Sequence, residues 1–317
     1  MSEAIAVLAT AYGGPEVLAL ESVAVPAPGP GEVVVDVRAA ALNPIDWKLF
    51  SGRMGADPAA LPRRVGLEAT GVIAEVGPGG ADGPRGPLAA GDEVIVYPAS
   101  GAWASRIVVP ASSCFPKPPS VSWEAGAGAM ATGVTAVHML AAGDVGDGDV
   151  VLVHGGAGGV GRTVIQLARA RGAARVIATA RPANHDALRA LGAEPIAYGD
   201  GLAERIRALA PDGVDVALDC VGTDEAIETS VQFARDRGRL VTIAAMPSAD
   251  LGFKVLGGFP GADPGTEVRD RARGEIVDLL ADGTLTIATA SYPLADAAAA
   301  VRDSRQNTAA GKIVLVP

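Results

Sequence analysis

The chain has 317 residues, of which 49% are hydrophobic and 20% charged, a composition typical of a globular protein of one or two domains. Acidic residues outnumber basic ones by 36 to 26, and this net charge of −10 argues against partners such as nucleic acid or an anionic membrane. The chain has no secretion-like start and no apolar run of the roughly 18 residues that a membrane-spanning helix needs, so we expect a cytoplasmic protein. Its two cysteines are too few for a four-thiolate zinc site, and we expect both to be reduced.

The first third of the chain has the pattern of a β-rich domain. Residues 32–42, 71–77 and 92–97 are strand-like, and Gly/Pro-rich breaks separate them. One such break, GPGGADGPRGP at 77–87, could be a linker between domains. Strand-like segments of the same character flank it on both sides, however, so we interpret it as a surface loop.

Near Val121 the pattern changes to strands that alternate with helices. Such alternation predicts a parallel sheet with helices on both faces. The alternation stops before residues 294–317, where a helix followed by a strand can return to the first domain. The segments of the alternating region are 150–155, 161–172, 174–180, 185–193, 213–222, 224–238 and 238–246.

A glycine-rich turn follows the first strand of this region. It reads Gly156-x-Gly158-x-x-Gly161 and opens a helix inside a strand–helix–strand unit. In that context the glycines permit a tight turn and close approach to a pyrophosphate, which the helix N-terminus attracts. The alternative is a turn in which the glycines serve packing only.

The end of the next strand indicates which nucleotide would bind. NAD sites usually place an acidic residue there, about 20 residues on, to hold the ribose 2′-hydroxyl. This chain has Thr179, Ala180 and Arg181 instead, and no acid before Asp186. Because guanidinium geometry suits a phosphate, the sequence favours NADPH over NADH. The alternative is that Arg181 is a solvated surface residue.

Five stretches together resemble the medium-chain dehydrogenase/reductase superfamily, and within it the zinc-independent quinone oxidoreductase-like group. They are NPIDWKLFSG (43–52), GLEATGVI (66–73), HGGAGGVG (154–161), DCVG (219–222) and GKIVLVP (311–317). The resemblance implies an α/β fold: a GroES-like β-rich catalytic domain, residues 1–121 completed by 286–317, around a doubly wound Rossmann NADP-binding domain, residues 122–285. It also implies a homodimer.

The resemblance also suggests residues that contact the cofactor. ATARPANHDALRALG resembles polyketide-synthase enoyl reductases, in which a lysine commonly stands at Asn184, so Arg181 would replace that phosphate contact. Tyr198 matches a tyrosine near the 2′-phosphate in related quinone reductases, with a half-buried strand tyrosine as the alternative. Thr135 matches a threonine near the nicotinamide, or else packs inside a helix. The expected cofactor-binding residues are Asn43, Thr135, Gly156, Gly158, Gly159, Val160, Gly161, Thr179, Arg181, Asn184, Tyr198, Val221 and Ala244.

Zinc enzymes of this superfamily have a cysteine in the first of these stretches and a histidine before the glutamate of the second. This chain has Asn43 and Leu67 there, and Glu68 with Asp46 would not hold a catalytic zinc, so we expect no metal. Without a Lewis acid, a conjugated acceptor is the better substrate, because charge can spread onto a carbonyl oxygen that hydrogen bonds stabilise.

The candidate catalytic residues are Asn43, Asp46 and Lys48. Asn43 could donate to an oxyanion or form a turn before proline, and Asp46 could order that turn. Lys48 could donate a proton or lie in solvent. We therefore expect NADPH-dependent reduction of a quinone or an α,β-unsaturated carbonyl compound. Two alternatives stay open: a tailoring enoyl reductase in a biosynthetic pathway, and a non-enzymatic NADPH-binding protein.

Overall fold

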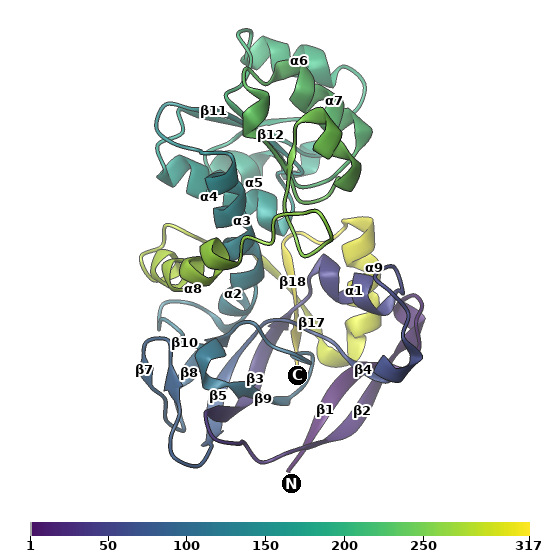
Figure 1. The fold of residues 1–317 in the computed structure, drawn as a ribbon, viewed down its shortest axis with the longest axis vertical. Coiled ribbons are helices and arrows are strands. Elements are labelled where there is room, and N and C mark those ends of the chain that lie inside the picture. The colour runs from purple at the N-terminus through teal and green to yellow at the C-terminus, as the bar shows by residue number, and fades with distance from the viewer. Residues whose placement is uncertain (1) are drawn as a thin grey trace. The chain divides into compact units, whose positions relative to one another are not determined.

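The computed structural model describes residues 2–317, apart from the side chain of Pro247. The chain forms two compact units. The first unit extends to Ala131 and resumes at Gly274, and the second unit comprises Thr132–Arg273. Figure 1 shows this return, with the yellow C-terminal strand β18 (Lys312–Val316) among the purple and blue strands of the first unit.

The units divide at 131 and 273, whereas the sequence had placed the boundaries at 121 and 285. Packing explains both shifts. Trp123 packs with Ala39 and Val314 of the first unit. Beyond residue 273, Arg85 donates to the carbonyl of Gly274 at 2.7 Å and forms an ion pair of 2.8 Å with Asp278. Contacts of this kind are not visible in a change of composition.

The first unit is mostly β-structure. Its main sheet has seven strands, in the order β10-β8-β5-β3-β18-β17 with β9 also on β3, and a smaller sheet has the order β2-β1-β4. Its strands are β1 (Ser2–Ala9), β2 (Leu18–Val25), β3 (Glu32–Ala41), β4 (Arg63–Arg64), β5 (Ala69–Val76), β6 (Asp82–Gly83), β7 (Gly86–Pro87), β8 (Glu93–Val96), β9 (Arg106–Pro110), β10 (Cys114–Pro116), β17 (Thr289–Pro293) and β18. Its helices are α1 (Pro44–Phe50), α2 (Trp123–Ala127) and α9 (Ala297–Gln306).

Two predictions about this unit are confirmed. Strands β5 and β8, on either side of the loop at 77–87, pair antiparallel in one sheet, so that loop is not a domain linker. The C-terminal strand β18 pairs antiparallel with β3, with Val314 opposite Ala41, so the end of the chain completes the first unit.

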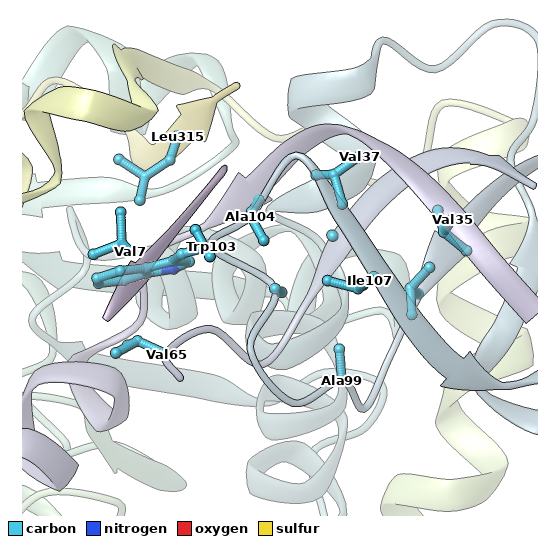
Figure 2. Packing of buried hydrophobic residues seen from close by; sticks show 14 of the residues in the cluster. Val7, Val35, Val37, Val65, Ala99, Trp103, Ala104, Ile107 and Leu315 are labelled. Carbon is cyan, nitrogen blue, oxygen red and sulfur yellow. The ribbon is translucent and has the colours of Figure 1, made fainter. Parts of the chain in front are cut away.

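The core of the first unit surrounds Trp103, which is fully buried. Figure 2 shows its indole among Val7, Val65 and Leu315, which come from parts of the chain far apart in sequence. The indole N–H donates to the Ala41 carbonyl at 2.9 Å, so burial leaves this donor satisfied. The Trp103 side chain therefore ties the end of β3 to the rest of the unit.

The second unit is a six-stranded parallel sheet with the order β13-β12-β11-β14-β15-β16. In chain order this is 3-2-1-4-5-6, the order of a doubly wound dinucleotide-binding sheet. Its strands are β11 (Val150–His154), β12 (Arg175–Thr179), β13 (Glu194–Ile196), β14 (Val216–Asp219), β15 (Leu240–Thr242) and β16 (Lys254–Val255). Its helices are α3 (Met130–Ala142), α4 (Gly159–Ala170), α5 (His185–Ala190), α6 (Leu202–Leu209) and α7 (Asp224–Phe233), while α8 (Thr266–Ala281) and the start of α3 cross the unit boundaries.

The alternating segment at 224–238 is helical only in its first part, because α7 ends at Phe233. There Phe233 enters the core, and Arg235 bonds to the Val214 carbonyl and forms an ion pair of 2.7 Å with Asp215. These tertiary contacts outweigh the helical propensity of the last residues.

Among residues 2–317, no helix combines the length and the apolar character that crossing a bilayer requires.

The substitution Trp103→Ala should lower the free energy of unfolding of the first unit by about 3–5 kcal/mol, because it leaves a large cavity and removes an indole donor. Urea unfolding followed by tryptophan fluorescence measures this, since Trp47, Trp103 and Trp123 all lie in the first unit. The control is Trp123→Ala, a half-buried tryptophan. A loss for Trp103→Ala no larger than that of the control would contradict the prediction.

Candidate functional site

The glycine-rich turn of the second unit joins β11 to α4. Gly155 has a φ of +75°, which glycine adopts without strain, and Gly158 is the N-cap residue of α4. Because α4 begins at Gly159, the N–H groups of Gly159, Val160 and Gly161 have no carbonyl partner within the helix. Such a helix start attracts anions, so the turn fits a pyrophosphate.

The three motif glycines have different structural reasons. A Cβ on Gly161 would lie 2.3 Å from the Gly155 oxygen, and one on Gly156 would lie 2.8 Å from the Ala178 Cβ. Packing therefore excludes side chains at both positions. A Cβ on Gly158 would meet its nearest atom at 3.4 Å, an ordinary contact. Packing alone does not explain this glycine, whereas close approach of a ligand does.

Buried polar groups support the turn from the sheet side. Thr179 Oγ1 accepts from the Gly155 N–H at 3.2 Å and lies 3.4 Å from Nδ1 of His154. Burial lowers the pKa of His154 to about 4, so the imidazole is neutral at pH 7. Thr179, expected to bind the cofactor, is itself buried and supports the turn through its hydrogen bond with the Gly155 N–H.

Arg181 and Tyr198 follow two neighbouring parallel strands. Thr179 of β12 pairs with Ile196 of β13, so both residues come two positions after the paired strand ends. Both side chains are exposed, Tyr198 by 53%, so Tyr198 is not the half-buried strand tyrosine weighed as an alternative. Asn184 lies in the same connection and is half-buried.

A second polar network holds the turns after β14 and β15. Asp219 is fully buried; its Oδ1 accepts from the N–H groups of Val221 and Gly222 at 3.0 and 2.9 Å, and its Oδ2 accepts from Thr242 at 2.6 Å. Thr242 Oγ1 accepts in turn from the N–H of Ala244 at 3.1 Å. The two residues expected at the cofactor, Val221 and Ala244, are exposed at the carboxyl ends of their strands.

Thr135 lies on α3, where its side chain is half-buried. Apart from Thr135 and Asn43, the predicted cofactor residues lie at or just after the carboxyl ends of the β-strands, where open α/β sheets bind their ligands.

In the first unit, the candidate residues lie at the start of α1. Asn43 is the N-cap residue, Pro44 occupies the first helical position, and Asp46 Oδ2 accepts from the Asn43 N–H at 2.7 Å. Asp46 therefore orders the helix start, as one of its two predicted roles required. The carboxamide of Asn43 has other partners.

That carboxamide belongs to a buried polar cluster. Asn43 Nδ2 donates to Glu68 Oε1 at 2.9 Å, and Lys312 Nζ donates to Asn43 Oδ1. The ammonium also donates to the Leu42 carbonyl at 3.1 Å and lies 3.5 Å from Glu68 Oε1. Glu68 Oε2 accepts from the Ala131 N–H at 2.8 Å. Asn43, Glu68 and Lys312 are 5%, 0% and 8% exposed, so water contributes little to these contacts.

Asp46 lies beside this cluster and is fully buried. Burial, the largest cause, together with the charge of Glu68, raises the pKa of Asp46 to about 7, although the backbone N–H groups of Asn43 and Gly66 and the charge of Lys312 act in the opposite direction. Its Oδ1 has no hydrogen-bond partner in the described structure. A proton on Oδ1 would remove the cost of a second buried negative charge beside Glu68.

Lys48 lies elsewhere on α1. Its Nζ is 6.0 Å from the centroid of the Trp47 ring, and its side chain is half-buried. Asn43 and Asp46 are thus brought together, and the contacts described for Lys48 do not connect it with them.

Metal-binding side chains do not gather at this place. Within residues 2–317, no three or more histidine, cysteine, aspartate or glutamate side chains are grouped so as to hold a metal ion. At the positions expected for ligands stand Asn43 and Leu67, while Glu68 already pairs with an ammonium. A cation placed there would meet the charge of Lys312, so the residues do not fit a zinc ion.

The sequence interpretation missed three residues that organise these sites: Asp219, Thr242 and Lys312. Signals for two of them existed. Asp219 ends an apolar strand, VALD, and Lys312 begins another, KIVLV. A charged residue in a strand that is otherwise buried implies a partner, but the sequence does not say which.

Two protein-family models match the chain. The alcohol dehydrogenase GroES-like domain matches residues 29–138, and the zinc-binding dehydrogenase domain matches residues 159–257.

Two curated relatives resemble it. The human synaptic vesicle membrane protein VAT-1 homolog is 34% identical over 238 residues, which cover 74% of this chain and 59% of that protein. The spectinabilin polyketide synthase system protein NorB of Streptomyces orinoci is 35% identical over 298 residues, 90% of this chain and 13% of that protein. The chain thus spans less than two thirds of these relatives.

Several solved structures match over their full length, among them two mycobacterial proteins. A mycobacterial quinone oxidoreductase is 32% identical with a TM-score of 0.79. A mycobacterial protein complexed with NADPH is 32% identical with a TM-score of 0.84, and in both cases the match covers 99% of this chain and 100% of the other. With both family models matched in their expected order, the chain belongs to the medium-chain dehydrogenase/reductase superfamily, as a quinone oxidoreductase-like oxidoreductase.

Proposed function

We propose that this protein is a zinc-independent, NADPH-dependent reductase of quinones or α,β-unsaturated carbonyl compounds. The observation that carries the proposal is the buried Asn43 carboxamide. It is an N–H donor at a position where zinc enzymes of the superfamily have a metal ligand.

The second unit would bind the dinucleotide. The N–H groups at the start of α4 and the space at Gly158 suit the pyrophosphate. Arg181 and Tyr198 would face the 2′-phosphate, which is consistent with the NADPH bound by the mycobacterial relative. Bound NADPH would supply the hydride.

The first unit would supply a hydrogen-bond donor to the carbonyl oxygen of the substrate that accepts the hydride. Hydride addition to an enone or quinone develops negative charge on a carbonyl oxygen, and a fixed N–H donor stabilises that charge best where water is excluded. Asn43 Nδ2 keeps a second hydrogen after bonding Glu68, and this hydrogen would bind the oxygen. Asp46, protonated on Oδ1, would keep further negative charge away from it.

The proposal of a conjugated acceptor follows from the weak activation that the Asn43 amide would give to a substrate carbonyl. A plain ketone needs a Lewis acid or a strong proton donor, whereas a conjugated acceptor already delocalises the charge. One amide hydrogen bond beside a neutral carboxyl is suited to the second kind of substrate.

The likeness to NorB favours one alternative, a tailoring enoyl reductase that acts on a biosynthetic intermediate. The chemistry at Asn43 would be the same, and pocket shape would decide the substrate. A non-enzymatic NADPH-binding protein is the other alternative. The homodimer and the cytoplasmic location expected from the sequence stay predictions.

Purified protein should oxidise NADPH in the presence of 1,4-benzoquinone, 9,10-phenanthrenequinone or a short enone, and should leave cyclohexanone unreduced. The loss of absorbance at 340 nm measures this, with and without a chelator. Dependence on zinc, or tight NADPH binding without turnover of any acceptor, would refute the proposal, and the second outcome would support the non-enzymatic alternative.

Replacing Arg181 by alanine should weaken NADPH about 10- to 100-fold while changing NADH by less than about twofold, because a charge-assisted phosphate contact contributes roughly 1.5–3 kcal/mol. Titration of nicotinamide fluorescence gives both dissociation constants. The matched control is Arg189→Ala, an exposed arginine in α5 whose partner is Asp186. Equal losses for the two nucleotides would contradict the assignment of NADPH.

The pKa of Asp46, raised to about 7, predicts a pH-dependent stability. Since an unfolded aspartate titrates near pH 4, the protonated carboxyl stabilises the folded state below that pH, and this stability is lost as pH rises through about 7. Between pH 5 and pH 7, wild type should lose about 1.4 kcal/mol per pH unit relative to Asp46→Asn, and the difference should level off above pH 7. Urea unfolding followed by tryptophan fluorescence measures both proteins, and a difference that does not vary with pH would show that Asp46 is ionised throughout.

A further inference from the structure

The buried cluster determines which way the Asn43 carboxamide faces. An ammonium can only donate hydrogen bonds and a carboxylate can only accept them. Lys312 therefore requires the oxygen of the carboxamide on its side, and Glu68 requires the nitrogen. The flipped amide would place donor against donor and acceptor against acceptor.

We infer that Lys312 and Glu68 form a positioning pair, which holds the Asn43 carboxamide with one Nδ2 hydrogen directed away from Glu68. This hydrogen would bind the carbonyl oxygen of a quinone or enone, a role that rests on the proposed function. Lys312 would thus be a positioning residue that acts through Asn43 and does not itself touch the substrate.

The surrounding structure is built to admit Lys312. It is the first residue of β18, and its N–H donates to the Ala288 carbonyl at 2.7 Å. Gly128, just after α2, leaves room for the lysine stem, because a Cβ there would lie 2.7 Å from the Lys312 Cγ. A glycine and a strand end are thus both arranged around one buried ammonium.

Stability alone does not explain this pair. Well-packed apolar residues of similar volume often replace a buried ion pair without loss of stability. The pair does secure a unique orientation, because Glu68 is held from its other oxygen by the Ala131 N–H and Lys312 by the Leu42 carbonyl. Donation to Oδ1 also polarises the amide, which strengthens the remaining N–H as a donor.

The test is a double-mutant cycle between Lys312→Met and Asn43→Ala, read as kcat with saturating NADPH and a quinone that wild type reduces. Lys312→Met alone should lower kcat about 10- to 100-fold. This loss is no larger than the roughly 100- to 1,000-fold loss that removal of a whole oxyanion donor causes. In the Asn43→Ala background the same substitution should change kcat less than about twofold, because no carboxamide is left to orient. Adding Lys312→Met should change the dissociation constant of NADPH less than about threefold, both in wild type and in the Asn43→Ala background, since the positioning acts on the acceptor's oxygen.

Lys312→Met leaves the Glu68 charge buried without its ion pair and can impair folding. The double variant Lys312→Met/Glu68→Gln removes both charges, so it should fold and still show the loss in kcat, since a glutamine accepts either orientation of Asn43. The matched control is Lys117→Met. Lys117 is 9% exposed, forms an ion pair of 3.0 Å with Glu93 in the same unit, and should change kcat less than about twofold.

Losses that simply multiply in the Lys312/Asn43 cycle, or a Lys117→Met effect as large as that of Lys312→Met, would overturn the inference. If wild type reduces no acceptor, the proposed function fails, and the orientation of Asn43 is then tested by a measurement that needs no turnover. The side-chain amide signals of Asn43 in a ¹⁵N-correlated NMR spectrum, assigned by their loss in Asn43→Ala, should then shift or broaden in Lys312→Met/Glu68→Gln. Unchanged signals would contradict a fixed orientation.

Discussion

One buried charge pair, Glu68 and Lys312, fixes the arrangement of the candidate site in the first unit. Both side chains are nearly inaccessible to water, so each charge needs the other and the hydrogen bonds around it. Because Lys312 lies at the C-terminal end and Glu68 precedes β5, the pair links the returning strand β18 to the first part of the chain. Asn43 lies between the two charges, and burial raises the pKa of Asp46 beside them to about 7, which disfavours a further negative charge there.

In the second unit, buried polar side chains likewise bind backbone N–H groups. The carboxyl ends of β11, β14 and β15 carry turns whose N–H groups are bound by buried side chains, Thr179 of β12 in one network and Asp219 with Thr242 in the other. These hydrogen bonds satisfy the polar groups on the inner side of the turns and so stabilise the shape of the turns. Function in both units is therefore proposed at places where buried polar groups, rather than apolar packing, decide the local geometry.

Much of the fold was predictable because it rests on local patterns. Repeated strand–helix units indicated the parallel sheet, and the glycine turn was identified from its place between a strand and a helix. Predictions failed where a remote contact decides the outcome. The end of α7 is determined by Val214 and Asp215, and the unit boundaries by Trp123 and Arg85. The hydrogen bond from the Gly155 N–H to Thr179 joins two strand ends and likewise had no signal in the local pattern.

The sequence by itself determined the family, the order of the two units and the residue types at the site, since these depend on periodicity, glycine spacing and the replacement of two expected zinc ligands by Asn43 and Leu67. Only the tertiary structure decided what surrounds Asn43. Residues 43, 68 and 312 are widely separated in the chain, and nothing in their local patterns indicates that they meet. Hydrogen bonds between charged and neutral groups are directional and short in range, so their pairing exists only once the strands have brought the three side chains together.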